Sequence, residues 1–171
     1  MKKWLFYLLP ALVPAGMLCS CNGPGKQFNQ TVTAALQLDS TIVGVSTVAE
    51  GLNVPWEICW GPDGQIWFTE QSGTVSTVDP VTGKKHLQLT IPEVYRHRSL
   101  GLLGMAVHPT APYVYLDYTH RTADSVIVSR LVRYTRGKDT LIDPKVLLEF
   151  PGNTGHNGSR VIIGPDGKVY Y

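Results

Sequence analysis

The chain has 171 residues, and its many Gly, Pro, Thr, Val and Tyr residues favour strands and turns over long helices. Its formal net charge is +2, and a leader over residues 1–20 would remove two lysines and leave +2 − 2 = 0. A neutral chain excludes the basic surface that nucleic-acid binding requires.

The first element is a leader over residues 1–20. Two lysines precede an apolar run over residues 4–13, and small, turn-prone residues follow over residues 14–20. The apolar run is too short to span a membrane. This layout predicts a secretory signal peptide and therefore an exported protein.

A cysteine follows the leader directly. Leu18 and Ser20 stand three residues and one residue before Cys21, which resembles the lipobox of bacterial lipoproteins; Cys19 lacks the small preceding residue. The resemblance implies lipidation of Cys21 and an exported lipoprotein of the periplasm or outer membrane. An ordinary signal peptide with a chance cysteine is the alternative. After processing only Cys59 would remain, in an apolar strand where a buried, inert thiol is expected.

The mature chain begins with a tether and continues as short strands. Residues 21–46 are polar and turn-rich at first and predict a tether leading into a first strand. In the region that follows, apolar residues alternate instead of recurring every 3.6 positions. Strands are predicted there over residues 56–60, 65–70, 74–79 and 86–91.

A nine-residue phrase occurs twice in full and once loosely. Residues 60–68 read WGPDGQIWF and residues 163–171 read IGPDGKVYY, with a looser copy over residues 107–115. Pro and Gly in the phrase specify a tight turn between two strands. A repeat of about 50 residues built from short strands predicts the blades of a β-propeller. A β-sandwich with two chance turns is the alternative.

The number of blades indicates a partial propeller. Closure needs about four to eight blades, whereas residues 47–171 supply about two to three. The sequence ends on Val169–Tyr171, within an expected strand, and an unpaired apolar strand edge promotes aggregation. We therefore expect an all-β domain over residues 47–171 that is the N-terminal part of a truncated propeller.

Two loops carry candidate functional residues. His156 lies in a glycine-rich loop over residues 152–160, where a histidine can act as a general base near neutral pH; an ordinary loop histidine is the alternative. Arg96, His97 and Arg98 form a basic cluster that could meet an anionic group, with a solvated loop as the alternative. No histidine pair has metal-ligand spacing, so no zinc site is predicted.

Four segments together resemble the soluble PQQ-dependent glucose/sorbosone dehydrogenases, which include aldose sugar dehydrogenases. They are residues 52–56, 60–70, 101–109 and 156–171. The resemblance implies a six-bladed propeller that oxidises an aldose or related sugar with PQQ and Ca²⁺ and passes electrons to an acceptor. It makes His156, in an HxxxR segment, the base that takes the anomeric hydroxyl proton while hydride passes to the quinone. Arg160 is expected to brace the loop, and Asn157 is a weaker bracing or pocket candidate.

The chain also departs from the family pattern. Members often carry Gln or Glu and then Asn or Gly before GLLG, where this chain has Ser99 and Leu100. Ser99 is thus a weak cofactor-binding candidate. The family's calcium ligands, its cofactor-clamping basic residues and the carboxylate that orients the histidine match positions beyond Tyr171, so the chain alone is expected to be inactive. A non-catalytic, lipid-anchored β-propeller binding module, or a chain without function, are the alternatives.

Overall fold

The computed structural model describes residues 31–171. The predicted signal peptide over residues 1–20 and the predicted lipidation of Cys21 lie outside the described residues. Within residues 31–171 no helix has the length and hydropathy that crossing a bilayer demands.

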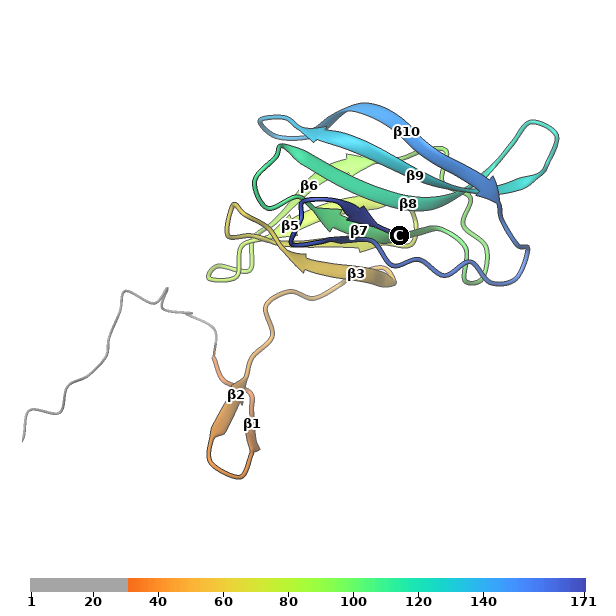
Figure 1. Ribbon diagram of the computed structural model, residues 1–171. Helices are drawn as coiled ribbons and strands as arrows, with labels where there is room; N and C mark the ends of the chain where they lie inside the picture. Colours follow the sequence, from red (N-terminus) through yellow and green to blue (C-terminus); the bar gives the residue numbers. More distant parts are fainter. Residues whose placement is uncertain (1–30) are drawn as a thin grey trace, which may run out of the picture.

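Two four-stranded antiparallel sheets form the body of the protein (Figure 1). The first blade consists of β3 (Pro55–Trp60), β4 (Ile66–Glu70), β5 (Thr74–Val78) and β6 (Lys85–Thr90). The second blade consists of β7 (Leu102–Val107), β8 (Tyr113–Arg121), β9 (Ile127–Arg136) and β10 (Leu141–Pro151). In both sheets the strands lie side by side in chain order, which is the arrangement of a propeller blade.

Two hairpins flank the blades. β11 (Ile162–Ile163) pairs with β12 (Val169–Tyr170) beside β7, where a third blade begins. β1 (Ala34–Gln37) pairs with β2 (Ile42–Val45) in a hairpin that stands apart from the sheets (Figure 1). This hairpin makes up most of the described part of segment 21–46, and all its strand residues are exposed.

The two full copies of the repeated phrase form the same turn. Gly64 donates its N–H to the Gly61 carbonyl at 3.0 Å, and Gly167 donates to Gly164 at 2.9 Å. Gly64 and Gly167 have φ angles of 73° and 74°, which glycine adopts without a steric penalty. The shared geometry explains why the phrase recurs, because each copy joins the first two strands of a blade.

The aspartates of the phrase anchor an aromatic side chain across the turn. Asp63 accepts a hydrogen bond of 3.1 Å from the Trp67 indole, and Asp166 accepts one of 3.1 Å from the Tyr170 hydroxyl. In the loose copy, the Nδ1 atom of His108 instead accepts the N–H groups of Thr110 and Ala111. His108 therefore stabilises its turn, as a structural residue.

The core lies mainly between the two blades. Leu102, Leu116 and Tyr118 of the second blade and Trp67 and Val75 of the first belong to one buried cluster. Burial contributes about 25 cal/mol per Å² of apolar surface. A smaller cluster on the opposite face of the second blade joins it to the β11–β12 hairpin: Ala106, Tyr115, Leu131 and Val161.

Cys59 packs against the main core cluster from β3, an edge strand of the first blade. Burial is the main cause that raises the pKa of its thiol to about 11. The thiol is therefore protonated at neutral pH, as expected for an inert core cysteine.

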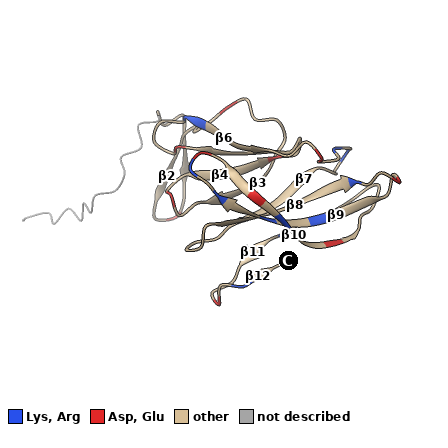
Figure 2. Ribbon diagram, turned by 90° about the horizontal axis from the view of Figure 1, so that it is seen from above, with Lys and Arg blue, Asp and Glu red and all other residues tan. Residues whose placement is uncertain are grey.

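Charged residues are interspersed over the blades, without a face of one sign (Figure 2). Acidic and basic residues occur together on β10, which carries Asp143, Lys145 and Glu149, and the arginines of β9 lie on the neighbouring strand. The distribution agrees with the small net charge. Electrostatic interactions are therefore local, in ion pairs and in individual pockets.

Candidate active site

His156 lies in the loop that joins β10, the last strand of the second blade, to β11. An isolated parallel bridge pairs its backbone with that of Ser99. Ser99 belongs to the loop over residues 91–101, which makes the equivalent connection between the first and second blades. The fold thus brings together His156, the candidate base, and Ser99, the candidate cofactor contact, which were both predicted from the sequence.

The His156 side chain is exposed, and its imidazole makes no hydrogen bond or ion pair within residues 31–171. Both ring nitrogens are therefore available to a ligand. A candidate general base needs this freedom, because it must reach the proton that it abstracts.

The Ser99 hydroxyl has a protein partner. It donates a hydrogen bond to the Gly155 carbonyl, one residue before His156. Its proton is thus used to hold the His156 loop, and only its oxygen lone pairs remain for a cofactor. The neighbouring Leu100 is completely buried and faces the protein interior.

We expect Ser99→Ala to loosen the His156 loop and to cost about 1 kcal/mol of stability, because the Gly155 carbonyl loses its donor. Hydrogen exchange at the amides of residues 155–157 and thermal unfolding measure both effects. Ser72→Ala is the control, since the Ser72 hydroxyl makes no hydrogen bond within the described chain. Equal exchange in the two variants contradicts the holding role.

Asn157 closes the loop on itself. Its Nδ2 group donates to the Asn153 carbonyl at 2.7 Å, and its Oδ1 atom accepts the Asn153 N–H at 2.8 Å. The Asn153 side chain in turn accepts the Gly155 N–H at 2.9 Å. These contacts are of the kind that bracing requires, and they direct the Asn157 amide into the loop.

Arg160 ties the end of the same loop to the first blade. Its guanidinium lies 3.2 Å from Oε1 of Glu57, which is on β3. The Arg160 side chain is 75% exposed, whereas that of Glu57 is 12% exposed. Such a partly exposed pair contributes at most about 1 kcal/mol, so its main effect is to fix the loop's direction.

The buried side chain of Gln71 holds the loop over residues 91–101 through hydrogen bonds. The Gln71 Nε2 group donates to the Arg98 carbonyl at 2.5 Å, and its Oε1 atom accepts from Arg96 Nε at 3.3 Å. The backbone carbonyl of Gln71 accepts the Leu102 N–H at 3.1 Å. Gln71 therefore positions the segment that carries Ser99, although no sequence motif marked it.

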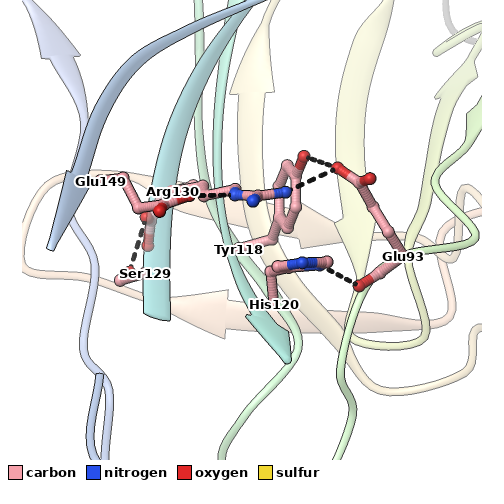
Figure 3. Close-up of polar contacts among 7 residues, drawn as sticks. Glu93, Tyr118, His120, Ser129, Arg130 and Glu149 are labelled. Atoms are coloured by element: carbon pink, nitrogen blue, oxygen red, sulfur yellow. Dashed lines mark hydrogen bonds and ion pairs between the residues drawn. The ribbon is translucent and has the colours of Figure 1, made fainter. Parts of the chain in front are cut away.

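Glu93 fixes the beginning of this loop against the second blade. Figure 3 shows Arg130 reaching between Glu149 and Glu93, while the Tyr118 hydroxyl donates to Glu93. Nδ1 of His120 lies 3.2 Å from the Glu93 carbonyl. Burial, and then the bond to Glu93, raise the pKa of Tyr118, so its hydroxyl stays a donor. The network anchors the start of the loop over residues 91–101 to β8, β9 and β10.

A buried carboxylate lies behind the His156 loop. Asp117 on β8 has no exposed surface, and its Oδ1 atom accepts the Ser129 hydroxyl at 2.9 Å. Its Oδ2 atom and the Ser159 hydroxyl oxygen are buried without a well-formed hydrogen bond in the described residues. Burial raises the pKa of Asp117, while the nearby hydroxyls of Ser159, Ser129 and Tyr171 oppose the rise.

We expect Asp117→Asn to be more stable than the parent by about 1–3 kcal/mol at neutral pH, since the amide fits a neutral buried site. The raised pKa of Asp117 stabilises the fold below the unfolded carboxyl pKa, and this contribution is lost as pH rises through the raised value. The free energy of unfolding in urea, measured from pH 4 upward, should thus fall less steeply in the variant. Asp124→Asn, at an exposed turn, is the control; equal pH slopes in both variants refute the assignment.

The described residues match only part of what the resemblance implies. Within residues 31–171 no three His, Cys, Asp or Glu side chains lie close enough together to hold a metal ion. The free His156 imidazole and the Ser99 hydroxyl lie on adjacent loops that a backbone bridge joins.

Comparisons with known proteins agree with this arrangement. A family model described as Glucose / Sorbosone dehydrogenase matches residues 52–171. Quinoprotein glucose dehydrogenase B of Acinetobacter calcoaceticus is 35% identical over 138 residues, which cover 72% of this chain and 29% of that protein.

Solved structures show the same relation. The PQQ-bound aldose sugar dehydrogenase of Streptomyces coelicolor matches with a TM-score of 0.63 and 30% identity over 73% of this chain and 39% of that chain. A putative glucose dehydrogenase of Thermus thermophilus matches with a TM-score of 0.62 and 30% identity over 71% and 38%. The chain spans about a third of the length of these relatives. The predicted fold, an all-β part of a propeller, is confirmed.

Proposed function

Because the chain belongs to the glucose/sorbosone dehydrogenase family, we propose that the whole protein oxidises an aldose or related sugar with PQQ. In this proposal His156 is the general base. The observation that carries the proposal is the free imidazole of His156 on a loop braced by Ser99, Asn157 and Arg160. The chain covers about a third of the length of its relatives, so the activity is proposed for the whole protein.

The chemistry divides between the cofactor and this chain. PQQ, when bound, supplies a quinone that accepts the hydride from the anomeric carbon. A ring nitrogen of His156 accepts the proton of the anomeric hydroxyl, which lets electron density move toward the departing hydride. Ser99 and Asn157 hold the loop so that little reorganisation precedes this transfer. Calcium is proposed from the family alone, and none of the described residues is assigned to it.

We also propose that the protein is exported and held to a membrane through an acylated Cys21, and that the electrons leave through an external acceptor. The support is the sequence pattern of residues 1–21. Metabolic labelling with a palmitate analogue tests this, with Cys21→Ser as the variant that should lose the label and Cys19→Ser as the variant that should keep it.

Reconstitution tests the enzymatic proposal. The chain, together with any coding sequence that continues it, is expressed and mixed with PQQ and Ca²⁺, and dye reduction is followed with a panel of aldoses. We expect reduction that needs both PQQ and sugar. PQQ binding without any sugar-dependent reduction contradicts the proposal.

A second candidate is a non-catalytic propeller that binds a ligand on the loop over residues 152–160. It is favoured by one observation: the Ser99 hydroxyl proton is already used by Gly155. Saturable sugar binding that is unaffected by PQQ, together with absence of dye reduction, identifies this candidate.

A further inference from the structure

A polar pocket of about 330 Å³ lies next to the bridge between Ser99 and His156. Three segments form it: the loop over residues 91–101, the turn between β8 and β9, and the His156 loop. The residues that line it include Tyr95, His97, Arg98, Arg121, Ser125 and Thr154. Arg98 precedes Ser99 directly, and Thr154 stands two residues before His156, so the pocket shares both of its site loops.

The pocket holds positive charge that no acidic side chain neutralises. Arg98 and Arg121 have no carboxylate oxygen within 4 Å in the described chain. Arg130 and Arg160, in contrast, both have carboxylate partners. Asp124 lies in the same turn as Ser125 but makes no ion pair there. A guanidinium without a partner is a strong, bidentate binding site for carboxylate or phosphate.

Aromatic stacking orients one of these cations without neutralising it. The Arg121 guanidinium lies 5.4 Å from the centroid of the Tyr95 ring. The His97 ring also stacks on Tyr95, with the ring centroids 6.3 Å apart. Tyr95 thus contacts both a cation and a second aromatic ring of the pocket lining.

The backbone under the pocket is held as well. Arg98 has a φ of 53° and Ser125 a φ of 65°, a region that such residues rarely adopt. The Arg98 carbonyl accepts from buried Gln71, and the Ser125 N–H donates to Thr122 at 2.9 Å. A conformation of this kind persists only where the surroundings impose it. The backbone of the basic segment over residues 96–98 is therefore held in place by the first blade, while its three side chains are exposed.

We propose that this pocket binds a carboxylate or phosphate group carried by the sugar, so that the substrate class is an acidic aldose such as a uronic acid or a phosphorylated aldose. The inference rests on the proposed function, since the pocket lies on the two loops that bring His156 and Ser99 together. The acidic group occupies the pocket between Arg98 and Arg121, and the anomeric end of the sugar points toward His156.

Binding is measured on the chain by calorimetry with glucuronate, glucose 6-phosphate, glucose and inorganic phosphate. We expect the two acidic sugars to bind and glucose to bind at least tenfold more weakly. Arg98→Gln and Arg121→Gln should each weaken acidic-sugar binding about tenfold. Arg133→Gln is the matched control, because Arg133 also stacks on a tyrosine, at 4.2 Å from the Tyr113 ring, but lies outside the pocket.

Ser125→Asp gives a second test in case an arginine variant unfolds. Aspartate tolerates the positive φ of this position, and its charge should repel the ligand. Equal binding of glucose and glucuronate, or equal loss in Arg133→Gln, overturns the proposal. Inorganic phosphate that binds as tightly as glucose 6-phosphate overturns the assignment of the pocket to a substrate.

Kinetics separate this inference from the proposed function. In the reconstituted protein, Arg98→Gln should raise the KM for acidic sugars about tenfold, so that the preference for acidic over neutral sugars is lost. If acidic sugars bind but no sugar is oxidised, the proposed dehydrogenase function fails and the pocket stands. If neutral sugars are oxidised as well as acidic ones, the inference fails and the function stands.

Discussion

Replacement of His156 by alanine is expected to lower sugar-dependent dye reduction by about 10²–10⁴-fold in the protein reconstituted with PQQ, because general-base catalysis contributes that much. The imidazole is exposed and makes no hydrogen bond within residues 31–171, so its removal leaves the loop contacts of Asn157 and Arg160 intact. The loss should therefore appear in kcat, with little change in PQQ affinity or in the melting temperature.

His86→Ala is the matched control, because His86 is also exposed but lies on β6 in the first blade. Its variant should keep full activity. Partial recovery of the His156→Ala variant by added imidazole would identify the missing group as a base. Undiminished activity in His156→Ala rules out the proposed role.

The blades could be foreseen because their turns carry strong local signals. The phrase around Gly61 and Gly164 specifies both a turn and the strands beside it, and the structure forms the two turns alike. Predicted strands over residues 56–60, 74–79 and 86–91 agree with β3, β5 and β6 to within one residue at each end.

The last strand of the second blade, β10, lacks these signals. β10 is paired with β9 through two register shifts, between Ile142 and Lys145 and between Val146 and Leu148. Irregular pairing breaks the alternation of apolar residues that marks a strand, and most of β10 is exposed. Local pattern therefore carries little information about this strand.

The supporting residues of the site could not be foreseen for a different reason. Gln71, Glu93 and Asp117 act through partners that are distant in the sequence, such as Arg98, Tyr118 and Ser129. Tertiary packing buries Gln71 and Asp117 and brings Glu93 against Arg130 and Tyr118, and no local sequence pattern predicts these contacts. The meeting of Ser99 with His156 was implied only by family resemblance, since nothing local connects the two loops.

The alignment of these loops depends on one glycine, and its replacement is the largest stability effect that we expect. Gly101 follows Ser99 and Leu100 and has a φ of 152°. A Cβ atom there would lie 2.3 Å from the backbone oxygen of Gln71, which cannot move aside as a side chain could. Gly101→Ala should therefore lower the free energy of unfolding by about 2–5 kcal/mol, from strained backbone and overpacking together.

Two glycines separate these contributions in urea unfolding. Gly167 has a φ of 74° with open space around its Cβ position, so Gly167→Ala reports backbone strain alone, about 1 kcal/mol. Gly158, in the His156 loop, has neither constraint, and Gly158→Ala should be neutral. If Gly101→Ala costs no more than Gly167→Ala, the close approach to Gln71 is not what sets the loop. If it costs more, the Ser99 segment is held by contact with the first blade, and His156 takes its position from that contact.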